Sequence, residues 1–258
     1  MLIRYPGSKD KHTILLKPFL QRAEKSRTVY EPFSGTASVT FYLLENNMVD
    51  YYHINDIDES IAALWQTVKD EPEKLIKAIK EYTPNVEDFY TFKAEPGETV
   101  FDKAFRKIVL HQISYSGLGG KAGGPLGGRA QASKYGVDCR WYPDKLASNI
   151  RKCSTLLNSV EGDISFGSWE KVVDAAIEKD GFIYLDPPYY VKGEELYING
   201  GLDHALLADR LKGSKDFVLS YDDVPEIREL YTWANVDKID VRSHLHHKMI
   251  TDVAITPL

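Results

Sequence analysis

The chain has 258 residues, 43% of them hydrophobic, and a formal net charge of −6 at pH 7. A chain of this length forms one large domain or a domain with a smaller one inserted. No apolar run reaches the roughly 18 residues of a transmembrane helix, and the N-terminal residues lack the apolar region of a signal peptide. Cys139 and Cys153 lie far apart and suit a reducing compartment. We therefore expect a globular protein of the cytoplasm.

Basic residues are concentrated in one part of the chain. Residues 100–155 carry ten Lys and Arg and three Asp, a net charge of +7, which leaves −13 for the remainder. A basic block in an acidic protein is typical of a site for a polyanion. A solvated charged face is the alternative that charge alone leaves open.

The first part of the chain reads as alternating strands and helices. Residues 28–30 are β-prone and run into a turn at residues 31–35, after which residues 38–44 have helical spacing. A second strand at residues 51–54 ends in a polar stretch, and the next helix places Ile61, Leu64, Trp65 and Val68 on one face. This β-α-β-α order predicts the opening of a doubly wound α/β sheet.

The middle of the chain is helical in pattern but is interrupted by glycines. Apolar spacing predicts helices within residues 70–110 and again over residues 146–157. Between them, residues 117–128 hold seven glycines, a density that no packed helix or strand tolerates, so a mobile loop or a hairpin tip is expected.

The last third returns to the α/β pattern. Strands are predicted at residues 182–185 and 217–220 with a helix at 202–211 between them, and two final strands at 236–241 and 249–255. We predict an α/β protein of discontinuous organisation. Residues 1–69 and 158–258 form the catalytic domain, and residues 70–157 form a mainly helical, Gly-rich inserted domain.

The turn from Glu31 to Gly35 is the first candidate binding site. A glycine turn between a strand and a helix lets a ligand approach the backbone, and Asp56, 21 residues after Gly35, follows the second strand. An acid at that spacing can accept both hydroxyls of a ribose, which indicates a nucleoside ligand. A tight turn with a helix-capping aspartate is the alternative.

The second candidate site is Asp186-Pro187-Pro188-Tyr189, which follows an apolar strand. The prolines cannot donate hydrogen bonds, so the Asp186 carboxylate and the Pro187 carbonyl remain as rigid acceptors. Two acceptors directed at one amino group draw its lone pair out of ring conjugation and toward an electrophile. Tyr189 offers a face on which an extruded base can stack.

These motifs resemble those of the Dam-type adenine-N6 DNA methyltransferases, the alpha group or D12 class. The resemblance rests on Tyr5-Pro6-Gly7-Ser8-Lys9, residues 31–39, Asn55-Asp56-Ile57-Asp58 and Asp186-Pro187-Pro188-Tyr189, in the order of the family. Ser114-Tyr115-Ser116-Gly117-Leu118 also resembles the start of the family's DNA-recognition insert. The resemblance spans nearly the whole chain.

The resemblance implies a Rossmann-like fold that binds S-adenosyl-L-methionine, releases S-adenosyl-L-homocysteine and needs no metal. The cofactor-binding residues that it implies are Tyr5, Lys9, Phe33, Gly35, Asp56, Asp163 and Asp186. Asp186, Pro187 and Tyr189 would hold the target adenine. Residues 70–157 would be the target-recognition domain, within which the basic side chains Lys121, Arg129, Lys134 and Arg140 are our candidate DNA contacts.

The sequence departs from the family at three positions. Ser8 and Ala37 replace glycines of the cofactor motifs, and Ser116 replaces an asparagine of the insert, which leaves the target sequence open. We expect duplex DNA as the partner, no membrane, a monomer or weak dimer on DNA, and a bacterial cell or a phage-infected host as the setting. Any restriction activity of a restriction–modification system would belong to another chain.

Two other functions remain open from the sequence. An RNA adenine-N6 methyltransferase would use the same chemistry with an insert that reads RNA shape. A catalytically silent paralogue would bind DNA through the insert but would have lost catalysis. The presence of Lys9, Asp56 and Asp186 argues against the second, and aspartate rather than asparagine at the head of the Pro-Pro-Tyr motif argues against a protein-glutamine methyltransferase.

Overall fold

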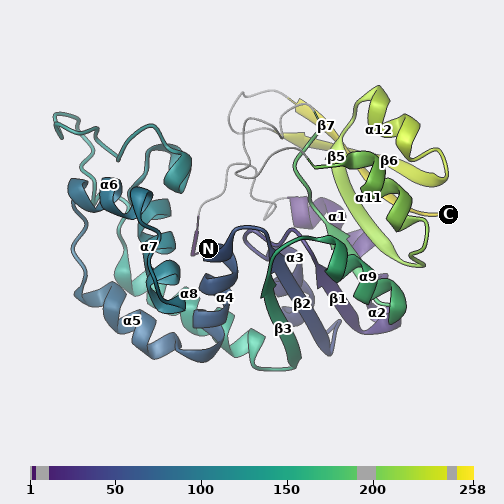
Figure 1. Cartoon of the computed structure of the whole chain (residues 1–258), viewed down its shortest axis with the longest axis horizontal. Coiled ribbons are helices and arrows are strands. Elements are labelled where there is room, and N and C mark those ends of the chain that lie inside the picture. The colour runs from purple at the N-terminus through teal and green to yellow at the C-terminus, as the bar shows by residue number, and fades with distance from the viewer. Residues whose placement is uncertain (1, 4–11, 191–201, 243–248) are drawn as a thin grey trace. The chain divides into compact units, whose positions relative to one another are not determined.

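The computed structural model of the chain describes residues 2–3, 12–190, 202–242 and 249–258 (Figure 1). It divides into two compact units, each described by itself. The sheet unit comprises Lys9–Ile57 and Val160–Leu258, and the helical unit comprises Met1–Ser8 and Asp58–Ser159.

The sheet unit is built on seven strands in the order β3-β2-β1-β4-β5-β7-β6. The strands are β1 (Thr28–Glu31), β2 (Tyr51–Asp56), β3 (Glu161–Phe166), β4 (Phe182–Leu185), β5 (Phe217–Asp222), β6 (Ala234–Arg242) and β7 (Met249–Pro257). The first five in this order pair in parallel, and β7 pairs antiparallel to both β5 and β6. Because the chain order reverses between β1 and β4, this is the switch point at which open α/β sheets bind their ligands.

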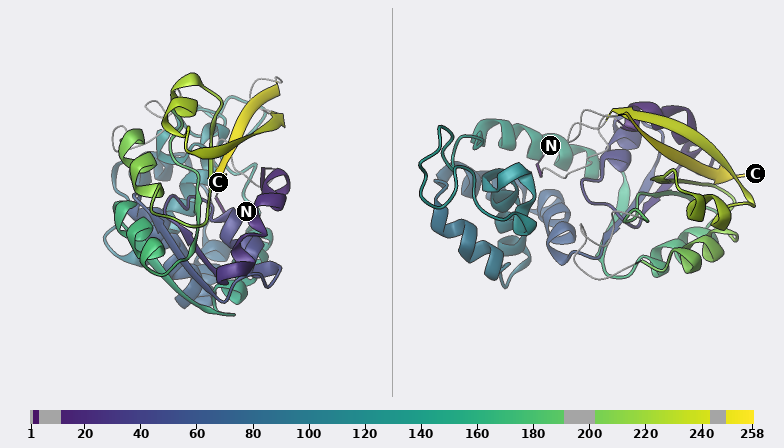
Figure 2. Two further views of the ribbon diagram at one scale, coloured as in Figure 1. Left: turned by 90° about the vertical axis from the view of Figure 1, so that its right-hand side faces the viewer. Right: turned by 90° about the horizontal axis from the view of Figure 1, so that it is seen from above.

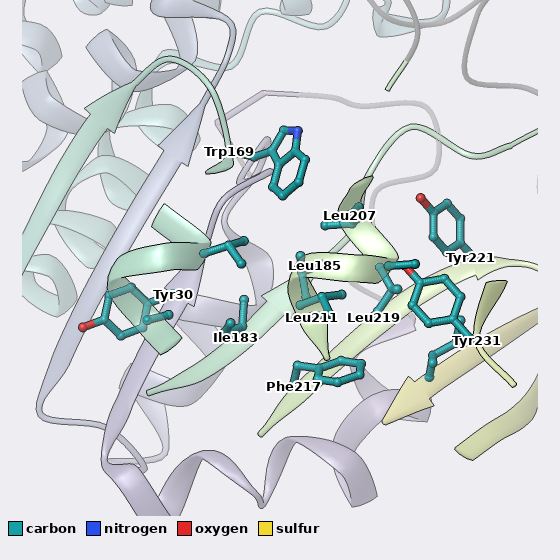
Figure 3. Close-up of a cluster of buried hydrophobic side chains, with 14 of the residues drawn as sticks. Tyr30, Trp169, Ile183, Leu185, Leu207, Leu211, Phe217, Leu219, Tyr221 and Tyr231 are labelled. Carbon is teal, nitrogen blue, oxygen red and sulfur yellow. The ribbon is translucent and has the colours of Figure 1, made fainter. Parts of the chain in front are cut away.

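Helices cover both faces of this sheet, with α1 and α3 on one face and α9 and α11 on the other (Figure 2). The helices of the unit are α1 (His12–Leu20), α2 (Ala23–Ser26), α3 (Ser38–Glu45), α9 (Glu170–Glu178), α11 (His204–Leu211) and α12 (Pro225–Leu230). All four residues of β4 are buried, as expected for a central parallel strand covered on both faces. Ile183 and Leu185 pack with Leu207, Leu211 and other apolar side chains in the core (Figure 3).

The described residues of the helical unit form five α-helices. They are α4 (Glu59–Asp70), α5 (Pro72–Glu81), α6 (Val86–Ala94), α7 (Val100–Ile113) and α8 (Pro143–Leu157). Helix α7 begins in a capping box between Thr99 and Asp102 and packs against α4. Among the described residues, no helix is long and apolar enough to cross a membrane.

The predicted fold class is confirmed, as are the predicted strands and the helical pattern of the middle. Strand β3 was not predicted. Helix α4 packs on α7 and α8 and so belongs to the compact helical unit. The domain bounds predicted from the sequence stay a prediction. The role of either unit stays a prediction at this point.

Candidate active site

Three carboxyl groups of the sheet unit come from the carboxyl ends of neighbouring strands. Glu31 ends β1, Asp56 ends β2 and Asp186 directly follows β4. All three therefore lie at the edge of the sheet formed by the carboxyl ends of the parallel strands, next to the switch point. Electrostatic repulsion from Asp186 and Asp56 acts on Glu31, which shows that the three groups share one environment. The structure therefore brings together the two motifs that the sequence singled out.

The turn after β1 is fixed by backbone hydrogen bonds to the end of β2. The Gly35 amide donates to Asp56 Oδ2 at 2.8 Å, and the Ser34 amide donates to the Asn55 carbonyl at 2.9 Å. Gly35 has a φ of +46°, and a methyl group built on its Cα would meet nothing within 4 Å. The turn thus leaves open space beside its backbone, as a ligand-binding turn requires.

Ala37 also adopts the left-handed conformation, with a φ of +48°, and is fully buried. This conformation costs a residue with a Cβ about 1–2 kcal/mol, a cost that glycine does not have. The φ angle gives a physical reason for glycine in the family's motif at this position. The alanine is accommodated here because the rest of the turn fixes its backbone.

Glu31 is buried and links β1 to helix α3. One of its oxygens, Oε2, accepts hydrogen bonds from the Thr40 amide, at 3.1 Å, and from the Thr40 hydroxyl. Burial, ahead of the nearby Asp186 and Asp56, raises the pKa of Glu31 to about 8. Glu31 is therefore largely protonated at neutral pH, and Asp56 and Asp186 are the carboxylates that remain to supply negative charge. Sequence reasoning treated Glu31 only as part of the turn.

The Asp186-Pro187-Pro188-Tyr189 segment is held by side chains of β5 and β7. The Ser220 hydroxyl donates to Asp186 Oδ1 at 3.0 Å, and the Tyr189 hydroxyl donates to Asp252 Oδ2 at 2.8 Å. Pro187 is buried. The Tyr189 ring packs against that of Tyr221 with centroids 6.2 Å apart. Both functional side chains of the motif are thus anchored.

Asp163 lies apart from this group. It sits in the middle of the edge strand β3, in register with His53, and its carboxylate accepts from the Tyr51 hydroxyl at 2.5 Å. Three residues later, at the carboxyl end of the strand, Phe166 is the register partner of Asp56 and is 62% exposed. The structure therefore places Phe166, which sequence reasoning missed, where Asp163 was expected.

Phe33 is half-buried beside Trp169, with ring centroids 6.2 Å apart. It belongs to the turn and so lies at the same edge as Asp56. Tyr5 and Lys9, the other predicted cofactor contacts, and the histidines at positions 244, 246 and 247 lie outside the described residues. Within the described part of the chain, no group of three or more His, Cys, Asp or Glu side chains has the arrangement of a metal site.

The glycine-rich segment of the helical unit has a defined backbone. Ser114 and Pro125 form an antiparallel bridge, and two 3₁₀ turns, η1 (Tyr115–Gly117) and η2 (Gly119–Lys121), lie within it. Gly127 has a φ of +76°, and a Cβ there would lie 2.3 Å from the Tyr135 carbonyl. The structure thus has the form of a hairpin tip, and four of its seven glycines, Gly117, Gly119, Gly127 and Gly128, adopt a positive φ.

The four predicted DNA contacts have different surroundings. Lys121 is partly buried on the helical unit, where burial, ahead of nearby Lys107, lowers its pKa. Arg129 lies over the ring of Tyr90 in α6, 5.3 Å from its centroid. Arg129, Lys134 and Arg140 form no ion pair with any residue of the described part of the chain, and the first two are exposed.

Three basic residues of the neighbouring helices are, by contrast, paired. Lys103 pairs with Glu59 at 2.6 Å, Lys107 pairs with Asp58 at 2.5 Å, and Arg151 pairs with Glu73 at 2.9 Å. The segment of residues 114–142, which we call the recognition loop, also carries three exposed tyrosines, Tyr115, Tyr135 and Tyr142. Unpaired cations beside exposed aromatic rings suit a nucleic acid, whose phosphates and bases they can contact.

A glycine turn with an acid on the neighbouring strand, beside an Asp-Pro-Pro-Tyr segment on a Rossmann-like sheet, defines a class of methyltransferase. The model of the D12 class N6 adenine-specific DNA methyltransferases matches residues 5–245. The chain belongs to this family.

Two curated relatives are type II methyltransferases. One is M.MjaIII of Methanocaldococcus jannaschii, 26% identical in an alignment of 181 positions that covers 62% of this chain and 57% of the relative. The other is M1.LlaDCHI of Lactococcus lactis subsp. cremoris, 28% identical in an alignment of 239 positions that covers 84% of this chain and 80% of the relative. The match thus spans less than two thirds of the archaeal relative.

Among solved structures, an uncharacterized protein of Listeria monocytogenes serotype 4b aligns with 95% of this chain and 67% of its own, at 10% identity and a TM-score of 0.42. That likeness is too distant to support a conclusion about this chain.

Proposed function

We propose that the protein transfers a methyl group from S-adenosyl-L-methionine to N6 of an adenine in duplex DNA. The observation that carries the proposal is the meeting of the Gly35–Asp56 turn and the Asp186-Pro187-Pro188-Tyr189 segment at one edge of the sheet, in a chain of this family. One motif suits a nucleoside cofactor and the other suits an amino group on a base.

Open space and negative charge at the Gly35–Asp56 turn support binding of the cofactor there. The Gly35 backbone is open to a ligand, and Asp56 Oδ2 is already held by the Gly35 amide, which orients the carboxylate toward the turn. We infer that Asp56 accepts the ribose hydroxyls and that Phe33 and Phe166 flank the adenine ring of the cofactor. The negative charge of Asp56 and Asp186 favours a cationic sulfonium over the neutral product, which assists product release.

The two acceptors of the Asp186-Pro187-Pro188-Tyr189 segment support binding of the target amine. S-adenosyl-L-methionine supplies an electrophilic methyl group when it is bound. The Asp186 carboxylate and the Pro187 carbonyl accept the two amino hydrogens of the target adenine, and the nitrogen lone pair forms the new C–N bond. The methyl–sulfur electron pair goes to sulfur, and the methylated amine then loses one proton to solvent. An adenine inside a duplex cannot reach these groups, so we propose that it is flipped out of the helix and stacked on Tyr189.

The helical unit is proposed to bind the duplex through the recognition loop. Its unpaired Arg129, Lys134 and Arg140 meet phosphates or base edges, and its exposed tyrosines contact bases. The names of the two relatives further suggest that the protein is the methylating partner of a restriction–modification system.

A labelling experiment tests this function. The full chain is incubated with a radiolabelled methyl donor and, separately, with duplex DNA, RNA and a protein mixture, and the labelled DNA is digested to nucleosides. We expect label in DNA alone, as N6-methyladenine. Label in RNA would favour the RNA methyltransferase, and DNA binding with no label in any substrate would favour the silent paralogue.

Replacement of Asp56 tests the cofactor site. We expect Asp56→Ala to weaken S-adenosyl-L-methionine binding by roughly 10- to 100-fold in calorimetry, because the ribose hydroxyls lose a charged acceptor. Asp56→Asn keeps an oxygen that can accept from the Gly35 amide. If this variant also loses cofactor affinity, the loss comes from ribose binding and not from the turn. Asp50→Ala, an exposed carboxylate just before β2 that pairs with Arg27, is the matched control. Unchanged affinity in both Asp56 variants would assign Asp56 to the turn alone.

A further inference from the structure

Asp252 is a buried carboxyl group that the proposed reaction does not use. It lies on β7 opposite Asp222 of β5, is 5% exposed, and is followed by the apolar residues Val253, Ala254 and Ile255. An ionised carboxylate in such surroundings is costly unless hydrogen bonds compensate it. An apolar side chain here would stabilise the sheet more simply, so the carboxylate calls for a reason other than stability.

The hydrogen bond from Tyr189 supplies that reason. The Tyr189 hydroxyl donates to Asp252 Oδ2 at 2.8 Å, and burial, ahead of the charges of Asp186 and Asp252, raises the pKa of this hydroxyl well above its ordinary value. The tyrosine therefore stays protonated and remains a donor. A hydrogen bond to a charged acceptor restrains the ring more strongly than packing against Tyr221 alone.

Ser220 acts on both functional side chains, because its hydroxyl contacts that of Tyr189 as well as Asp186. It is a buried residue of β5, and its hydroxyl donates to Asp186 Oδ1 at 3.0 Å. Since β5 and β7 are neighbours in the sheet, the two contacts come from adjacent strands that are themselves fixed by backbone pairing. One oxygen of Asp186 is engaged by Ser220, and the orientation of the carboxylate is set.

We propose that Asp252 and Ser220 are positioning residues that hold Tyr189 and Asp186 in the orientation needed for the target adenine. This inference rests on the proposed function. It also goes beyond the expectation from sequence, in which Tyr189 offers only the face of its ring for stacking. With the hydroxyl bonded to Asp252, its removal releases the ring and leaves a buried carboxylate without this donor.

The test compares turnover in four single variants and one double variant. We expect Tyr189→Phe and Asp252→Leu each to lower kcat about 10-fold or more, the size of a lost charged hydrogen bond, with KM for the cofactor unchanged. Asp252→Asn keeps an acceptor oxygen and should stay within about 3-fold of wild type. The Tyr189→Phe, Asp252→Leu double variant should be no slower than the slower single variant, because both remove one interaction.

Tyr231→Phe is the control. Its hydroxyl is buried in the same core and makes no hydrogen bond with any described residue, so its removal should leave kcat unchanged. If Asp252→Leu does not fold, Tyr189→Phe decides, since it breaks the same bond and keeps Asp252. If the wild type is active and Tyr189→Phe keeps its kcat, or if the losses add in the double variant, the positioning role is refuted and the proposed function stands. A wild type that labels no DNA overturns the proposed function, and the positioning role with it.

Discussion

Replacement of Asp186 by alanine is expected to lower the rate of methyl transfer by about 10²–10³-fold, the effect of removing one preorganised polar partner of a transition state. The loss arises because only the Pro187 carbonyl would remain to accept from the target amine. The fold should persist, since Asp186 lies after the last residue of β4 and is only partly buried, outside the apolar core around that strand. Cofactor affinity should change much less than turnover.

Single-turnover kinetics with excess enzyme measure this chemical step apart from product release. Asp180→Ala is the matched control, because Asp180 is an aspartate of the same unit that pairs with Lys215 on the surface. Thermal unfolding and calorimetric cofactor binding show whether the Asp186→Ala protein is intact. Near-normal turnover in an intact Asp186→Ala protein would refute the proposed mechanism.

The buried strands and the long helices could be predicted because their physical signals are local. Strand β4 is an uninterrupted apolar run that ends at prolines, and α4 and α7 have clear apolar faces. Strand β3 gave no such signal. It is an edge strand of alternating polar residues, Glu161-Gly-Asp-Ile-Ser-Phe166, with neither face fully buried, so its pairing with β2 is a tertiary effect that composition does not show.

The site was predictable in its motifs and less so in its geometry. Gly35, Asp56 and Asp186 are found at one edge because each ends or follows a parallel strand, which sequence pattern reveals. That Phe166, and not Asp163, pairs with Asp56 depends on the register of β3, a strand that was not predicted. The raised pKa of Glu31 depends on burial between elements far apart in sequence.

The conformation of the recognition loop also could not be predicted from local sequence. Seven glycines predict an irregular segment correctly, but they do not distinguish a mobile loop from turns that need positive φ. That distinction came from the buried Ala122 and Leu126 and from the bridge of Ser114 with Pro125, which are contacts within the folded unit. Deleting residues 119–128 would therefore damage the helical unit itself, and substitutions at its surface are the better probe.

Affinity for DNA is expected to fall steeply with salt, with a slope in log–log form of about −0.9 for each phosphate contact. Replacing Arg129, Lys134 and Arg140 together by glutamine should reduce the slope by up to about 2.7 and weaken binding at least ~10-fold at low salt. These three are chosen because they form no ion pair within the described part of the chain, whereas Lys103, Lys107 and Arg151 of the adjoining helices do. Fluorescence anisotropy at several salt concentrations measures both quantities.

Arg151→Gln is the matched control, because it removes the same charge from a side chain that is already paired with Glu73. Its slope should equal that of the wild type. The single variants then assign roles: a residue that contacts only phosphate weakens binding to cognate and scrambled duplexes alike, whereas a base-reading arginine relaxes specificity at one position of the site. If the triple variant kept the wild-type slope and affinity, the recognition loop would not contact DNA, and recognition would lie in the helices that carry it.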